Sequence, residues 1–245
     1  MIQAIAFDFG NTLFPLRPRE LDRLLDALAE YLAAHVPPFE FAAMRAKYLE
    51  IRDRQFTENR ATLAENDLRA RIAETAAFVA GVEAVDPALV DEALEVYTEQ
   101  FVRALEMPPW LPVLLTELSA SYALGVLSNY PLALPIFRAL DVHGLTPLFK
   151  TIVVSADIGF IKPHPSVFDA LLAGLALPPE KVVYIGDDWE ADIVGASRAG
   201  INAIYTRQWR DEEDKHYGSQ NVRPMAEIND LRDLPHVLRA ATRGA

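Results

Sequence analysis

Apolar and polar positions follow two different rhythms along this chain. Residues 2–7 form a short apolar run that stops at Asp8, which predicts a buried strand. From residue 19 to residue 106, apolar side chains instead recur every three or four positions, as at Leu24 and Leu28. Several such apolar faces follow one another, so we predict a unit of about four helices without strands.

After Pro108, short apolar runs alternate with helical segments. Strands that alternate with helices form parallel sheets covered on both faces, so we predict an α/β fold. Residues 1–14 and 107–245 would form its core, with residues 15–106 as a helical insertion after the first strand. Residues 208–224 are polar and predict a loop. The four later strands are predicted at residues 124–127, 151–154, 182–185 and 202–205.

Composition narrows the function classes. Of 245 residues, 51% are apolar and 24% are charged, as in globular proteins. The chain has no cysteine, which excludes disulfides, thiolate zinc sites and thiol nucleophiles. Its net charge of −12 disfavours nucleic acid as a partner, because phosphate contacts need clustered Lys and Arg. It lacks an 18-residue apolar run and a basic leader, so we expect no membrane association and a cytoplasmic location.

Polar residues stand where the predicted strands end. In open parallel sheets, ligands bind beyond the carboxyl ends of the strands, so these residues are expected to meet at one edge. Asp187 follows the fourth strand, and Lys162 lies in the loop after the third. The full candidate set is Asp8, Gly10, Asn11, Thr12, Ser128, Asn129, Lys162, Asp187, Asp188 and Asp192.

This set of residues fits one kind of chemistry. Carboxylates suit Mg²⁺, which usually takes one or two of them together with substrate phosphate. A carboxylate can also attack phosphorus and form an aspartyl-phosphate. Lys162 would offset negative charge, while Ser128, Asn129 and loop N–H groups would bind phosphoryl oxygens. Asp188 and Asp192 are four positions apart, so on a helix they would share a face.

These residues resemble the motifs of the haloacid dehalogenase superfamily, which consists mostly of phosphatases. Residues 8–12 are similar to its nucleophile loop, and residues 124–128 to the strand that ends in a phosphate-binding Ser or Thr. Residues 159–168 resemble the lysine loop, and residues 184–196 the acidic metal-binding loop. The resemblance implies a Rossmann-like parallel sheet and an all-helical cap, which the helical stretch matches in size and place.

The resemblance also implies an activity, namely Mg²⁺-dependent hydrolysis of a small phosphorylated metabolite. Asp8 would be the nucleophile, Ser128 would hold the transferring phosphoryl group, and Lys162 would orient Asp8 and neutralise charge. The residues expected to bind the substrate are Asn11, Thr12, Ser128, Asn129 and Lys162.

Metal ligands are implied at Asp8, at the carbonyl of Gly10 and at Asp187, with Asp188 and Asp192 as ligands or supports. One position departs from the family pattern. Family phosphatases carry an aspartate two residues after the nucleophile, which protonates the leaving group and then activates water. Gly10 stands there and supplies no proton. General acid–base catalysis is worth ~10² to 10⁴ in rate, so we expect slow turnover or a need for good leaving groups.

Three alternatives remain open. Phosphonoacetaldehyde hydrolases of the family also lack the second aspartate and use a cap lysine, and Lys47 is the only lysine before residue 150. Haloacid dehalogenases use an aspartate nucleophile without Mg²⁺ and alter the acidic loop, which Asp187 and Asp188 argue against. A catalytically degenerate member that binds a phosphate ligand or a protein partner is supported by Gly10 alone.

Overall fold

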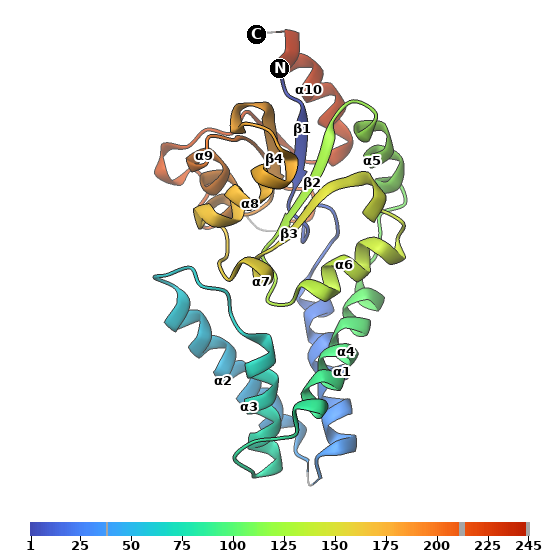
Figure 1. Cartoon of the computed structure of the whole chain (residues 1–245), viewed down its shortest axis with the longest axis vertical. Coiled ribbons are helices and arrows are strands. Elements are labelled where there is room, and N and C mark those ends of the chain that lie inside the picture. The colour runs from blue at the N-terminus through green and yellow to red at the C-terminus, as the bar shows by residue number, and fades with distance from the viewer. Residues whose placement is uncertain (38, 211–213, 244–245) are drawn as a thin grey trace. The chain divides into compact units, whose positions relative to one another are not determined.

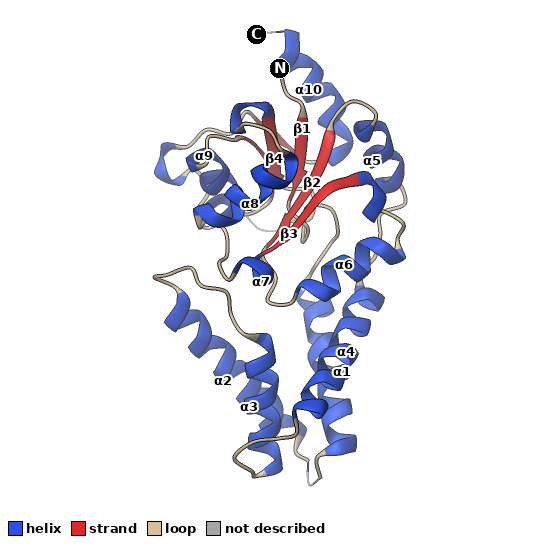
Figure 2. Cartoon of the chain, in the orientation of Figure 1, coloured by secondary structure: helices blue, strands red, loops and turns tan. Residues whose placement is uncertain are grey.

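The chain divides into two compact units. Met1–Pro15 and Glu106–Ala245 form an α/β unit, and Leu16–Leu105 form a helical unit. Figure 2 shows all the strands within the α/β unit. The structure, a computed structural model, describes residues 1–37, 39–210 and 214–243, with the backbone alone at 18 and 241–243.

A parallel sheet with the strand order β3-β2-β1-β4-β5-β6 forms the centre of the α/β unit, which confirms the predicted fold class. β1 lies between β2 and β4, and the strand order reverses there (Figure 1). Open α/β sheets bind ligands beyond such a reversal, so the sheet places a site at the end of β1. The strands are β1 (Ala4–Phe7), β2 (Ala123–Ser128), β3 (Phe149–Val154), β4 (Val182–Gly186), β5 (Asn202–Thr206) and β6 (Ala226–Ile228).

Both faces of this sheet are buried. Successive side chains of a strand point to opposite faces, and all four residues of β1 are fully buried. Ala4 and Ala6 pack in one cluster with Phe168 and Leu171 of α8 (Pro165–Leu175). Figure 1 shows α8 and α9 (Gly195–Arg198) on one side of the sheet and α5 (Leu111–Ser119) on the other. A continuous apolar run is therefore what a central parallel strand requires.

The segment between β4 and β5, where the alternation of strands and helices predicts an ordinary helix, has a different form. A π-helix at Trp189–Val194 comes first, and the short α9 follows it. Asp188 begins the π-helix, because its side chain accepts a hydrogen bond from the backbone N–H of Ala191 at 2.8 Å. The remaining helices of this unit are α6 (Ala133–Val142), α7 (Ser155–Ile158) and α10 (Leu234–Arg243).

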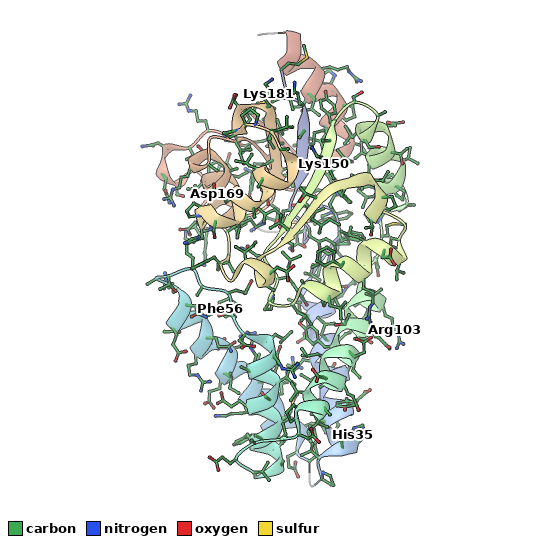
Figure 3. The ribbon with its side chains drawn as sticks, viewed as in Figure 1. His35, Phe56, Arg103, Lys150, Asp169 and Lys181 are labelled. Atoms are coloured by element: carbon green, nitrogen blue, oxygen red, sulfur yellow. The ribbon has the colours of Figure 1, made fainter. Side chains whose placement is uncertain are left out.

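The described residues of the helical unit form four helices, of which α1 packs along α4 and α2 along α3. Asp86 caps the start of α4: its side chain accepts a hydrogen bond from the backbone N–H of Ala88 at 2.9 Å. Polar side chains such as His35 and Arg103 lie on the outside of this unit (Figure 3). Within the described residues, no helix is long and apolar enough to cross a lipid bilayer. The helices are α1 (Pro18–His35), α2 (Phe41–Asn59), α3 (Leu68–Ala80) and α4 (Pro87–Ala104).

Candidate active site

The carboxyl ends of β1, β2 and β4 bring the first site residues together. Phe7 pairs with Val126 on β2 and with Ile185 on β4, so the residues that follow it on the three strands lie at one level. Asp8 therefore leaves the sheet at the level of Leu127, one residue before Ser128, which ends β2 and is buried. The predicted convergence at this edge follows directly from the parallel register.

Lys162 is the centre of the buried polar network. Its Nζ lies 2.6 Å from Asp8 Oδ1 and 2.7 Å from Asp192 Oδ1. The same ammonium donates to the hydroxyl of Tyr184 at 2.9 Å and lies 3.2 Å from the carbonyl oxygen of Leu127. The Lys162 side chain is only 2% exposed, so its charge is compensated by these neighbours rather than by water.

Asn129 fixes the loop that carries Lys162. Its Oδ1 accepts a hydrogen bond from the backbone N–H of Lys162 at 2.7 Å, and its Nδ2 donates to the Lys162 carbonyl at 3.2 Å. The side-chain amide of Asn129 thus pairs with both the backbone N–H and the backbone carbonyl of Lys162, a residue 33 positions later in the chain. This contact gives Asn129 a positioning role, in addition to the phosphoryl contact predicted from sequence.

Three carboxylates form a candidate cation site. Asp8, Asp187 and Asp192 are buried, and each offers an oxygen within 4.8 Å of the others. Like charges at this separation repel unless a cation joins them. Hard carboxylate oxygens are the donors that Mg²⁺ prefers, so the set fits that ion. Gly186 makes the arrangement possible, because a Cβ at this position would overlap the carboxyl group of Asp192.

Two of the predicted metal-binding carboxylates have further backbone partners. Asp192 Oδ2 accepts a hydrogen bond from the backbone N–H of Asp188 at 2.9 Å, which holds it inside the site. Asp188 itself caps the π-helix through Ala191, and its side chain is 49% exposed. Of the two, Asp192 belongs to the buried carboxylate cluster, and Asp188 shapes the turn that presents it.

The turn after β1 has a defined backbone conformation. Gly10 pairs with Phe14, and the backbone N–H of Asn11 donates to the Phe14 carbonyl at 2.7 Å. Asn11 has a φ of 55°, a conformation that asparagine tolerates better than most residues. The Thr12 side chain is fully buried, and its Oγ1 has no hydrogen-bond partner among the described residues.

Arg210, Asp214 and Tyr184 complete the site and were not foreseen as participants. Arg210 Nε lies 2.9 Å from Asp187 Oδ2, and its Nη2 lies 3.3 Å from Asp214 Oδ2. Asp214 in turn accepts hydrogen bonds from the backbone N–H groups of Trp189 and His216 at 2.8 Å. The loop after β5 is therefore tied to the acidic loop. Its sequence offers no periodic signal, whereas Tyr184 was detectable as a polar group in an apolar strand.

Burial and mutual repulsion raise the pKa values of the carboxyl groups. Burial raises the pKa of Asp8 to about 7, although the Lys162 ammonium opposes it. Burial, together with the charges of Asp8 and Asp192, raises the pKa of Asp187 well above its usual range. The positive charge of Arg210 acts in the opposite direction but is the smaller effect. For Lys162 burial acts in the opposite sense, but the adjacent carboxylates outweigh it and raise its pKa. The cluster is thus short of positive charge near neutral pH.

Comparison with known proteins now identifies the family. A family model described as haloacid dehalogenase-like hydrolase matches residues 2–200, which include all the site residues predicted from sequence. The chain belongs to the haloacid dehalogenase-like hydrolases. The predicted family and its Rossmann-like fold are confirmed, and the chain is a member of a hydrolase family.

Relatives in this family include phosphatases of small molecules. A glyceraldehyde 3-phosphate phosphatase from Methanopyrus kandleri is 30% identical over 155 residues, which are 63% of this chain and 66% of that protein. A phosphoserine phosphatase from Thermus thermophilus is 29% identical over 91 residues, or 37% of this chain and 34% of that protein. The alignments with the first three curated relatives span 53% to 66% of those proteins' lengths.

Solved structures resemble the whole chain. A 2-haloacid dehalogenase from Pseudomonas syringae superimposes with a TM-score of 0.76 at 26% identity, covering 98% of this chain and 99% of that one. The HAD hydrolase YfnB from Bacillus subtilis, described as bound to magnesium, gives a TM-score of 0.66 at 23% identity, covering 97% and 98%. The second likeness shows the shared fold alone.

Proposed function

We propose that this protein is a Mg²⁺-dependent phosphatase that hydrolyses small phosphorylated metabolites through an aspartyl-phosphate on Asp8. The observation that carries this proposal is the 2.6 Å contact between Lys162 Nζ and Asp8 Oδ1, inside the cluster that contains Asp187 and Asp192. A nucleophilic carboxylate must be ionised and held in one orientation, and the Lys162 contact favours both. The phosphatase relatives support the same reaction class.

Each bond change of the proposed reaction balances without a redox partner. A carboxylate oxygen of Asp8 attacks phosphorus, the new O–P bond forms, and the ester P–O bond breaks. The leaving oxygen takes a proton from solvent. Water then attacks the phosphorus of the aspartyl-phosphate, loses a proton to solvent, and releases inorganic phosphate with Asp8 restored. Ser128 and the N–H groups of the turn after β1 would hold the phosphoryl oxygens, and Lys162 would offset their charge.

The carboxylates of Asp8, Asp187 and Asp192, with the carbonyl of Gly10, would hold Mg²⁺. When bound, the ion supplies positive charge that stabilises the phosphoryl oxygens in the transition state. Lys162 and Arg210 already neutralise part of the cluster from two sides.

Gly10 decides which substrates are turned over. The proton that family phosphatases take from an aspartate at this position must come from solvent or from the substrate itself. This loss is worth ~10² to 10⁴ in rate for poor leaving groups and little for aryl phosphates, whose leaving oxygen needs no proton. Gly10→Asp is therefore expected to accelerate alkyl phosphate hydrolysis more than aryl phosphate hydrolysis.

Phosphate release tests the proposal. Wild-type protein should release phosphate from p-nitrophenyl phosphate with Mg²⁺ and not with EDTA, and Asp8→Asn should abolish the release. Asp157→Asn, an exposed aspartate of the same unit, is the matched control and should keep full activity. Activity that survives in Asp8→Asn would contradict the assignment of the nucleophile, and no release from any aryl or alkyl phosphate would remove the phosphatase proposal.

Dehalogenation is the second candidate, because the structural relative with a TM-score of 0.76 is described as a 2-haloacid dehalogenase. Both reactions begin with attack by an aspartate. They differ in the need for a cation, which the buried Asp187 and Asp192 favour here. Halide release from 2-chloropropionate in EDTA, lost in Asp8→Asn, would replace the phosphatase proposal with this one.

The structure gives the phosphonate alternative little support. A Schiff-base lysine must be unpaired and desolvated to act as a nucleophile. The ammonium of Lys47 instead lies 2.7 Å from Glu50 Oε1, and it lies over the ring of Phe78. Borohydride trapping with phosphonoacetaldehyde is expected to leave Lys47 unmodified.

A further inference from the structure

Arg71 on α3 is a buried cation whose hydrogen-bond partners are neutral. The residue is 5% exposed. Its Nε and Nη2 both donate to Gln55 Oε1, at 3.0 and 2.7 Å, and its Nη1 makes a long contact of 3.4 Å with the hydroxyl of Tyr48. The guanidinium also lies 5.3 Å from the centre of the Tyr48 ring. Charged side chains are rarely buried to this extent without a counter-ion.

Arg71 has no carboxylate partner among the described residues, whereas several other arginines of the helical unit do. Among the described residues, no carboxylate lies within 4.0 Å of the Arg71 guanidinium. Ion pairs are instead made by exposed arginines, where they are worth little, and leaving a buried charge unpaired costs far more. Thus the arginine that would gain most from a counter-ion has none. Exposed pairs of this kind include Arg45–Asp22, Arg54–Glu74, Arg69–Asp91 and Arg103–Glu99.

We infer that Arg71, Tyr48 and Gln55 form an anion-binding site in the helical unit, which takes a carboxylate or phosphate group of a small molecule. A guanidinium presents five N–H donors on two edges that match oxyanions. The Nε–Nη2 edge binds the carbonyl of Gln55, whereas the Nη1–Nη2 edge has only the long contact to Tyr48. An oxyanion on that second edge would make two charge-assisted hydrogen bonds and supply the missing negative charge. This inference goes beyond the proposed phosphatase chemistry and does not depend on it.

Thermal unfolding with added anion tests the site directly. Midpoints would be measured in EDTA with sodium malonate or sodium phosphate, against sodium chloride of equal ionic strength, for wild type, Arg71→Met and Arg54→Met. The excess stabilisation by malonate or phosphate should reach at least roughly 5 °C at a hundredfold excess over Kd in wild type and in Arg54→Met. The malonate response should vanish in Arg71→Met. Comparing variants removes the general stabilisation that excluded anions give to any fold.

Gln55→Glu gives an independent test that, unlike Arg71→Met, removes no buried side-chain volume. The carboxylate would stand where Gln55 Oε1 already accepts two bonds from Arg71, so it mimics a bound anion within the chain. This variant loses the hydrogen bond from Gln55 Nε2 to the Asp67 carbonyl, so the readout is its anion response, which should be absent with malonate. An equal anion response in wild type, Arg71→Met and Gln55→Glu would overturn the site, as would no excess response in wild type.

Kinetics then distinguishes the source of the anion, if the proposed phosphatase activity is present. If the group belongs to the substrate, Arg71→Met should raise KM for phosphomonoesters that carry a carboxylate and leave KM for p-nitrophenyl phosphate unchanged. If it belongs to a separate molecule, malonate should bind with the same affinity whether or not a phosphomonoester is present. Because the unfolding measurements use EDTA, failure of the phosphatase proposal would leave the anion site tested on its own.

Discussion

Lys162 shows how one buried ammonium can organise a site made from distant parts of the chain. Its contact with Asp8 joins residues 154 positions apart, and its contact with Asp192 joins residues 30 apart. An ammonium donates three hydrogen bonds, and here it has two carboxylates, a hydroxyl and a carbonyl within reach. The orientation of Asp8 is therefore fixed by several restraints, each of which can be removed separately.

The raised pKa of Asp8 makes stability depend on pH in a stated direction. Burial raises its pKa from 3.8 to about 7, so the folded chain holds this proton more tightly than the unfolded chain. The stabilisation due to Asp8 is then fully present below about pH 4 and is lost as pH rises through about 7. In EDTA, wild type should lose stability relative to Asp8→Asn between about pH 4 and pH 7. Urea unfolding of both proteins across this range measures the difference, and parallel curves would contradict it.

Arg210 is expected to act as a positioning residue for Asp187. Its Nε holds Asp187 Oδ2 and leaves Oδ1 for a cation, so Arg210→Gln should weaken Mg²⁺ binding by roughly 10- to 100-fold. Isothermal titration calorimetry with Mg²⁺ measures the change without activity. Arg207→Gln is the matched control, because Arg207 belongs to the same loop and pairs with Glu227 at the surface. Tighter Mg²⁺ binding in Arg210→Gln would mean that charge repulsion, not orientation, is the larger effect.

The sequence predicts those site residues that lie at strand ends, but not those that reach the site from irregular loops. Asp8, Lys162 and Asp187 were predictable, because each follows an apolar strand and strand ends meet in a parallel sheet. Arg210 was not predictable, since it reaches Asp187 from an irregular loop whose path no periodicity fixes. The capping bond of Asp188 and the backbone contacts of Asn129 also depend on local geometry that residue identity alone leaves open.

At the scale of elements, the Asn129 side chain holds the backbone of the loop between α7 and α8 to the end of β2. Asn129→Ala removes both hydrogen bonds to the Lys162 backbone, at a cost of about 1–3 kcal/mol for the buried groups left unpaired. We expect kcat to fall more than KM changes, because Lys162 moves relative to Asp8. Kinetics with an aryl phosphate and unfolding midpoints measure the two effects. Asn229→Ala, at an exposed position, should change neither, and an unchanged kcat in Asn129→Ala would reject the positioning role.

The length of each strand explains whether the sequence predicts it. The five long apolar runs became β1 to β5, with boundaries shifted by no more than two residues. The sequence does not predict β6, because this strand has three residues, of which only Ile228 is buried, and so short a segment carries no alternation to detect. The sequence predicts an ordinary helix where the π-helix lies, because about one extra residue per turn changes the spacing of apolar residues too little to be detected.

At the scale of the molecule, the tryptophans report on one unit only. All three, Trp110, Trp189 and Trp209, lie in the α/β unit. Mg²⁺ at 100 times its Kd stabilises the unit that binds it by about 2.7 kcal/mol, which corresponds to roughly 5–10 °C. The unfolding transition seen by tryptophan fluorescence should therefore shift with Mg²⁺, and the shift should be absent in Asp187→Asn. A shift retained in Asp187→Asn would place the ion elsewhere.

The position of β1 has a consequence for how this chain is made. β1 is the middle strand of the site, yet both its neighbours are synthesised after the entire helical unit. At about 5–20 residues per second, roughly 6 to 24 s pass between the synthesis of Phe7 and that of its partner Val126. During that time the apolar strand has no sheet to join and can attract other chains or chaperones. A slow codon or pause in the helical segment would lengthen that wait, so the yield of folded protein should be sensitive to translation speed there.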